Sequence, residues 1–123
     1  MEFKTKITRI GNNALNNDDQ LLVLFGDSVT SEIAEVSLSQ KFEDADLQSQ
    51  FTLKSGDQVF IGKRSYKVKY AGNMIEENMR TMGHINLIFG KSSNDVLSSA
   101  VYLDGNLVLD DIKVGTVITY HSV

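Results

Sequence analysis

A helical pattern gives way to a strand pattern within one segment, Glu76-Glu77-Asn78-Met79-Arg80-Thr81-Met82-Gly83-His84-Ile85-Asn86-Leu87-Ile88-Phe89. Before the glycine, apolar residues recur at the spacing of one helix face, whereas after it apolar and polar residues alternate. Glycine most readily takes the left-handed conformation that ends a helix. The segment therefore predicts a short helix that ends at Gly83 and leads directly into a strand.

The predicted helix runs from about Met74 to Met82, with Asn73 as its N-cap. Glu76 follows Asn73 by three residues, which is the spacing of a capping box, and Glu76 and Arg80 are placed to form an ion pair. One face of this helix is apolar and consists of Ile75, Met79 and Met82. A helix this short is marginal alone, so we expect it to pack on the rest of the protein by this face.

The rest of the chain is dominated by short segments in which apolar and polar residues alternate. The expected strands are Phe3–Ile10, Leu21–Phe25, Val36–Leu38, Val59–Ile61, Tyr66–Tyr70, His84–Phe89, Val101–Leu103, Leu107–Leu109 and Val117–His121. Many short strands favour a mostly β fold, here a small closed or partly open antiparallel β-barrel with one short α-helix packed on it. At 123 residues, the whole chain (1–123) is expected to form a single domain.

Two pairs of these strands are spaced as hairpins. The first joins Val59–Ile61 to Tyr66–Val68 through Gly62, and the second joins Val101–Leu103 to Leu107–Leu109 through an Asp-Gly step. Glycine supplies the positive φ that such turns require. A further short segment, Ser31–Glu35, is compatible with one turn of helix.

Composition excludes several classes of function. The chain has no cysteine and two histidines, which argues against disulfide scaffolds, thiolate nucleophiles and metal centres. A net charge of -4 argues against nucleic acid as a partner. No apolar run approaches the roughly 20 residues that span a bilayer, and the first residues lack the apolar core of a signal peptide. We therefore expect a cytoplasmic protein that does not insert into the membrane.

His84 is the residue best placed for covalent chemistry, because imidazole alone titrates near neutral pH without help. It begins the more polar face of its strand, and its ring could accept a phosphoryl group. Arg80 and Asn86 are possible helpers on the phosphate side. The residue types alone favour the alternative, structural interpretation, in which His84 is bonded to backbone at the junction between helix and strand. His121, near the C-terminus, is the weaker candidate.

These motifs together resemble the glucitol/sorbitol-specific IIA component of the bacterial phosphoenolpyruvate-dependent sugar phosphotransferase system. The most specific part is Glu77-Asn78-Met79-Arg80 with Met82-Gly83-His84-Ile85. Further matches are Ile7-Thr8-Arg9-Ile10-Gly11, Gly72, Leu87, Phe89, Asp110-Asp111-Ile112, Gly115 and Val117. The resemblance implies a small cytoplasmic β-barrel that relays a phosphoryl group from the histidine-containing phosphocarrier protein to the IIB component of a sugar permease, whose membrane part is IIC. It implies no organic cofactor and no metal.

The sequence departs from the family at the phosphoacceptor. Members usually carry the acceptor histidine in a strand well before the helix, in the region that aligns with residues 35–42, and Gln40 stands at or next to that position. A glutamine amide can copy some hydrogen bonds of imidazole but cannot hold a transferable phosphoryl group. Two hypotheses follow: either His84 serves as the acceptor, or the chain is a IIA-like binding or regulatory module without phosphotransfer.

Overall fold

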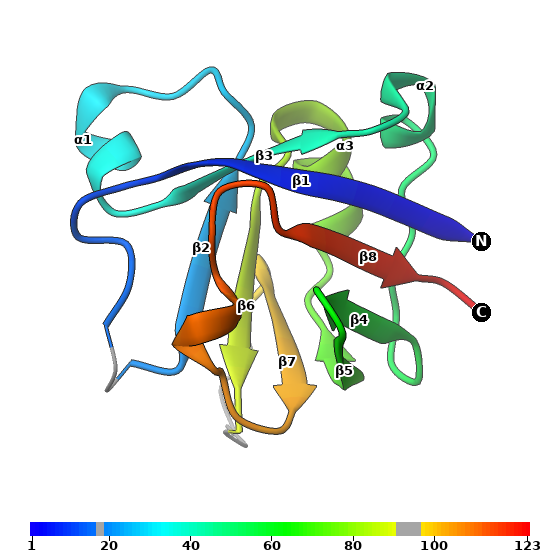
Figure 1. Cartoon of the computed structure of the whole chain (residues 1–123). Helices are drawn as coiled ribbons and strands as arrows, with labels where there is room; N and C mark the ends of the chain where they lie inside the picture. Colours follow the sequence, from blue (N-terminus) through cyan, green and yellow to red (C-terminus); the bar gives the residue numbers. More distant parts are fainter. Residues whose placement is uncertain (17–18, 91–96) are drawn as a thin grey trace.

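In the computed structural model, which describes residues 1–16, 19–90 and 97–123, the strands close into a barrel (Figure 1). The order around the barrel is β1-β3-β2-β6-β7-β5-β4-β8, with β8 pairing back to β1. The strands are β1 (Glu2–Ile10), β2 (Leu21–Phe25), β3 (Leu38–Phe42), β4 (Gln58–Ile61), β5 (Arg64–Ala71), β6 (Ile85–Phe89), β7 (Ala100–Asp104) and β8 (Val117–His121). The expected mostly β, closed barrel is confirmed.

Two of the strand pairs are parallel rather than antiparallel. β2 pairs with β3 in parallel, and so does β6 with β7, whereas the other described pairs are antiparallel. A parallel pair needs a crossover connection between its strands. Between β2 and β3 this connection contains α1 (Ser31–Glu35), which confirms the expected helical turn. The alternation of side chains within a strand is the same whether its neighbour runs parallel or antiparallel. The sequence pattern therefore could not tell the parallel pairs from the antiparallel ones.

The barrel interior is filled by the inward-facing side chains of all eight strands. Phe51, which lies in no strand, packs its ring against Phe3 and Tyr120 at centroid distances of 5.1 and 5.3 Å. The other fully buried side chains of the core include Ile7, Leu22, Leu24, Leu38, Ile61, Ile85 and Phe89. Such close packing of apolar side chains makes the barrel a solid core and not a pore.

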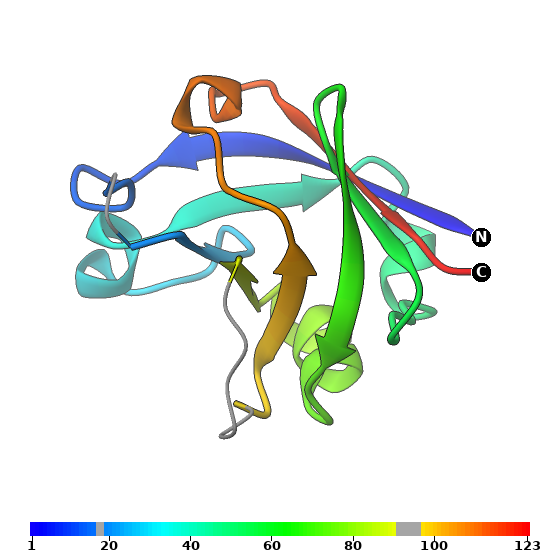
Figure 2. The ribbon, with the colours of Figure 1, turned by 90° about the horizontal axis from the view of Figure 1, so that it is seen from below.

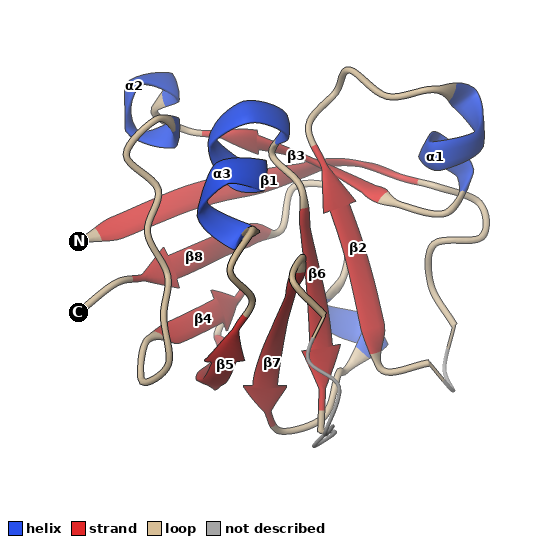
Figure 3. Cartoon of the chain, turned by 180° about the vertical axis from the view of Figure 1, so that it is seen from behind, coloured by secondary structure: helices blue, strands red, loops and turns tan. Residues whose placement is uncertain are grey.

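Among the described residues, three short α-helices lie at one end of the barrel (Figure 3), where one helix and one further helical turn had been expected. They are α1, α2 (Ala45–Gln48) and α3 (Ile75–Met82), the last matching the predicted helix. The expected cap was wrong: Met74 occupies the N-cap and makes no side-chain capping bond. Glu76 and Arg80 do pair, with 3.7 Å between carboxylate and guanidinium. None of the helices in the described residues is long and apolar enough to cross a membrane.

The apolar face of α3 is narrower than predicted. Ile75 and Met79 are fully buried, but Met82 is 48% exposed. Ile75 and Met79 are one helical turn apart and lie over the core, whereas Met82 belongs to the last turn, at the rim of a pocket described below. Met82 lines that pocket and is not buried in the core.

The first expected hairpin is confirmed, and the second is wrong. β4 and β5 pair antiparallel around Gly62, which has a φ of +59°. The residues after β7 do not return as a strand, because β7 already pairs with β5 on one edge and β6 on the other. They form instead a connection with one turn of 3-10 helix, η1 (Leu109–Asp111), that covers the second end of the barrel (Figure 2). The strand expected at Val36–Leu38 also lies later, as β3, because Val36 terminates α1.

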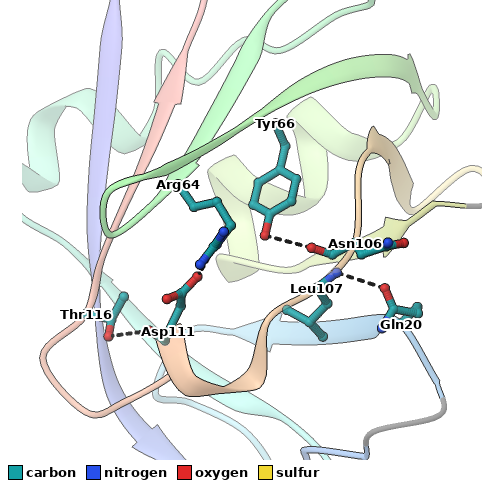
Figure 4. Close-up of polar contacts among 7 residues, drawn as sticks. All are labelled: Gln20, Arg64, Tyr66, Asn106, Leu107, Asp111 and Thr116. Carbon is teal, nitrogen blue, oxygen red and sulfur yellow. Dashed lines mark hydrogen bonds and ion pairs between the residues drawn. The ribbon is translucent and has the colours of Figure 1, made fainter.

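Polar contacts hold this β7–β8 connection in place (Figure 4). The backbone amide of Leu107 donates to Gln20 Oε1 at 2.8 Å, and the Tyr66 hydroxyl donates to the carbonyl of Asn106 at 3.0 Å. Arg64 Nε lies 2.7 Å from Asp111 Oδ2 in an ion pair. Within this connection, the side chains of Leu107 and Ile112 are buried. The main pocket described below lies instead at the end of the barrel where the helices gather.

Candidate functional site

The helical end of the barrel carries a pocket of about 600 Å³. Its wall is made by the end of β2 and the segment after it, by α1, by β3, by α2 and by the last residues of α3. The lining mixes apolar and polar side chains, and the charged side chains in it are Asp27 and Lys41. Gln40, which the resemblance in sequence places at or next to the family's usual acceptor position, belongs to the same wall.

Two glycines bring the end of α3 against the end of β2 beside this pocket. Gly83 ends α3 with a φ of +63°, the left-handed conformation predicted from the sequence. The amide of Gly26 donates to the carbonyl of Met82 at 2.8 Å. A Cβ at Gly83 would lie 3.0 Å from the Gly26 nitrogen, so side chains at this contact would push the two elements apart. The absence of both side chains thus sets where His84 enters β6.

His84 is fixed by two contacts at the start of that strand. Its Nδ1 lies 3.0 Å from the backbone carbonyl of Leu24, and its ring stacks on Phe25 with centroids 4.0 Å apart and planes 14° apart. A carbonyl can only accept, so Nδ1 carries the proton. In the neutral ring the lone pair is then on Nε2, and that nitrogen is the nucleophilic one. The structural interpretation of His84 and its chemical one are therefore compatible.

The two suggested helpers have other partners. Arg80 Nε donates to the carbonyl of Phe51 at 2.9 Å and its guanidinium pairs with Glu76. Asn86 Nδ2 donates to Ser99 Oγ at 3.1 Å. The other histidine, His121, lies on β8 with Nδ1 3.4 Å from Glu2 Oε2. None of these side chains is assembled with His84 into a catalytic group.

Gln40 is 2% exposed, and its amide is fully used inside the barrel. Its Oε1 accepts from Thr5 Oγ1 and from the Tyr120 hydroxyl, each at 2.8 Å. Its Nε2 donates to the Gly83 carbonyl at 2.9 Å and lies 3.5 Å from Met79 Sδ. Burial raises the pKa of Tyr120 far above its ordinary value of 10.0, so this hydroxyl stays protonated and remains a donor. The network satisfies every hydrogen-bonding position of the amide.

Arg9 is a charged residue near the site that the sequence reasoning did not single out. Its Nε donates to Ser39 Oγ at 3.1 Å, its Nη1 donates to the Ala34 carbonyl at the end of α1, and its Nη2 has no hydrogen-bond partner among the described residues. The sequence pattern could have singled out Arg9, because this residue continues the alternation of Phe3, Thr5 and Ile7, whose side chains face the core. This alternation would turn the charged Arg9 toward the apolar core, and a β-bulge between Ile7 and Arg9 relieves that conflict.

No candidate metal centre forms in the described part of the chain. Acidic and histidine side chains there do not gather in threes as a metal site would need. The fold and site together therefore define a small closed barrel with one pocketed end, next to which a single imidazole is held in one tautomer.

Comparison with known proteins identifies the family. The sequence model of the family described as "PTS system glucitol/sorbitol-specific IIA component" matches residues 2–119. The glucitol/sorbitol-specific EIIA component of Escherichia coli (strain K12) is 30% identical over 122 residues, covering 98% of this chain and 95% of that protein. The component from Shigella flexneri matches equally, at 30% identity over the same shares. The chain belongs to the glucitol/sorbitol-specific IIA family of the phosphotransferase system.

A solved structure agrees with this assignment. The crystal structure of a PTS system IIA component from Enterococcus faecalis V583 superposes with a TM-score of 0.84 at 27% identity, covering 97% of this chain and 99% of that one. The resemblance noted in the sequence is confirmed, and family and fold together support the role of a IIA phosphocarrier.

Proposed function

We propose that this IIA component takes a phosphoryl group from the histidine-containing phosphocarrier protein onto Nε2 of His84 and passes it to the IIB component of a glucitol/sorbitol permease in the cytoplasm. The observation that carries the choice of residue is the 3.0 Å contact between His84 Nδ1 and the Leu24 carbonyl. It directs the lone pair to Nε2 without any further group. Residues 1–123 would act as one domain, since β1 and β8 close the barrel on each other.

The transfer needs no oxidant or cofactor. The Nε2 lone pair attacks the phosphorus of the donor phosphohistidine, the nitrogen–phosphorus bond of the donor breaks, and the electron pair of that bond returns to the donor imidazole. The same exchange with a nucleophilic side chain of IIB discharges His84. Both steps depend mainly on positioning and charge stabilisation. The stack on Phe25 and the bond to Leu24 supply the positioning of the acceptor.

A second function is favoured by a different observation. The Gln40 amide, at or next to the position where the resemblance implies an acceptor, has all its hydrogen-bonding positions occupied, and an amide cannot form a transferable phosphoryl intermediate. A IIA-like module that binds the same partners without passing a phosphoryl group would have this structure.

Incubation with phosphoenolpyruvate, Enzyme I and the phosphocarrier protein, followed by intact mass measurement, tests the two functions. The proposed relay predicts an acid-labile gain of one phosphoryl group, lost in His84→Gln and retained in the matched variant His121→Gln. Absence of the gain in the wild-type chain, with binding of the phosphocarrier protein still detected by NMR, would establish the module instead. A gain that survives His84→Gln would remove His84 from the acceptor role.

A further inference from the structure

The peptide unit that joins Gly83 to His84 is held at both ends. Its carbonyl, on Gly83, accepts from Gln40 Nε2 at 2.9 Å, and its N–H, on His84, donates to the carbonyl of Asn78 at 3.2 Å. A peptide unit is planar and rigid, so fixing both groups fixes the direction in which the His84 Cα leaves the junction. The hydrogen bond to the Asn78 carbonyl is made to α3 itself. The hydrogen bond from Gln40 reaches the junction from β3, across the barrel interior.

The Gln40 amide is itself held by hydrogen bonds to its oxygen. Thr5 on β1 and Tyr120 on β8 both donate to its Oε1, and these two residues and Gln40 are 2% exposed or less. The two hydroxyls orient the amide so that its N–H group points at Gly83. Three strands, β1, β3 and β8, thus converge on a single carbonyl next to His84.

We infer that Gln40 is a positioning residue for His84: from inside the barrel it holds the Gly83 carbonyl and thereby fixes the ring orientation and the tautomer of His84. A loss of this bond frees the Gly83–His84 peptide unit to rotate. The imidazole then loses its alignment with the Leu24 carbonyl and the Phe25 ring, which are the contacts that direct the lone pair to Nε2. Only the kinetic consequence of this inference rests on the proposed function.

The position demands a side chain with a donor and an acceptor side by side. Glutamine and neutral histidine meet this demand, whereas methionine has a similar volume and no N–H group. A matched control exists in Gln48, whose Nε2 donates to the carbonyl of Met79 in the same helix at 3.0 Å. Gln48 thus makes the same kind of bond to α3 without touching the junction before His84.

The test is the tautomer of His84, measured by two-bond nitrogen–proton correlation spectra of the wild-type chain, Gln40→Met, Gln40→His and Gln48→Met. We expect a single Nδ1–H form in the wild type, a mixture of both tautomers in Gln40→Met, the wild-type form in Gln48→Met, and its recovery in Gln40→His. In parallel, the rate of phosphoryl labelling at saturating phosphocarrier protein should fall about tenfold to a hundredfold in Gln40→Met, since a displacement near 1 Å can cost that much.

The outcomes separate this inference from the proposed function. An unchanged Nδ1–H signal in folded Gln40→Met would overturn it, and so would an equal loss in Gln48→Met. If the wild type takes no label, the proposed function fails while the tautomer spectra still decide the role of Gln40. If Gln40→Met does not fold, Tyr120→Phe replaces it: removing one of the two hydroxyl donors to Oε1 should shift part of the His84 signal, and an unchanged signal would equally overturn the inference.

Discussion

Gly26 and Gly83 lie in direct backbone contact, so that a Cβ on Gly83 would come within 3.0 Å of the Gly26 nitrogen and 3.3 Å of its Cα. The contact joins the end of β2 to the end of α3 and places His84 beside Phe25. Because neither residue has a side chain, the Gly26 amide can reach the Met82 carbonyl. The geometry of the candidate site therefore depends on two residues that carry no chemistry of their own.

Gly83→Ala should lower the free energy of unfolding by more than the about 1–2 kcal/mol that a left-handed conformation costs an L-residue, because the new Cβ also meets Gly26. Gly62→Ala is the matched control, since Gly62 has a similar φ of +59° but nothing within 4 Å of its Cβ position. Urea denaturation of both variants measures the difference. Equal losses would mean that the contact with Gly26 has no energetic weight.

Phe25→Leu should slow phosphoryl labelling of His84 by up to about tenfold, because an aromatic pair contributes about 0.5–1.5 kcal/mol beyond its buried area. Phe25→Tyr retains the ring and should label at nearly the wild-type rate. Since Phe25 also lines the pocket, the comparison is made at saturating phosphocarrier protein, where binding no longer limits the rate. A leucine variant as fast as the tyrosine variant would contradict a positioning role for the stack.

The stability of the protein should fall as the pH rises above about 10, the ordinary pKa of tyrosine. Burial raises the pKa of Tyr120 in the folded state, so its contribution is complete below pH 10 and is lost as the unfolded chain begins to ionise. The expected slope is about 1.4 kcal/mol per pH unit for this one group. Urea denaturation from pH 8 to pH 11, a range chosen to bracket roughly that pKa, measures it.

Tyr120→Phe should be less stable than the wild type at pH 8, a value roughly two units below the tyrosine pKa, because Gln40 loses a donor. Its stability should nevertheless decline less at alkaline pH. Thr5→Val removes the other hydroxyl donor to Gln40 without removing a titratable group, and so it should keep the wild-type slope. Parallel curves for Tyr120→Phe and the wild type would show that the alkaline loss arises elsewhere.

Asp57→Ala should destabilise the fold by about 1–3 kcal/mol, because two backbone amides lose the acceptor that a buried carboxylate gives them. Asp57 is 1% exposed, and its two carboxylate oxygens accept from the amides of Lys54 at 2.8 Å and Val123 at 3.0 Å. Asp57→Asn retains one acceptor and should lose less. Hydrogen exchange at the Lys54 amide should accelerate in the alanine variant, and unchanged exchange there would refute the assignment.

Much of the fold could be predicted where the pattern is local. The α3 segment, its end at Gly83 and the β4–β5 hairpin each depend on residues close together in the chain, and each is found in the structure. The errors are long-range: the strand expected at Leu107–Leu109 fails because both edges of β7 are already occupied. The expected burial of Met82 fails because helical periodicity cannot tell where the barrel beneath the helix ends.

The sequence by itself determined the family, the barrel class, the helix that precedes His84 and a segment, residues 35–42, that contains Gln40 and no histidine. These follow from the order, spacing and type of residues along the chain. The tertiary structure alone decided which nitrogen of His84 holds the proton, and that Gln40 binds the carbonyl next to it. Both depend on hydrogen bonds between residues 43 or more positions apart, which form only when the closed barrel brings their strands together.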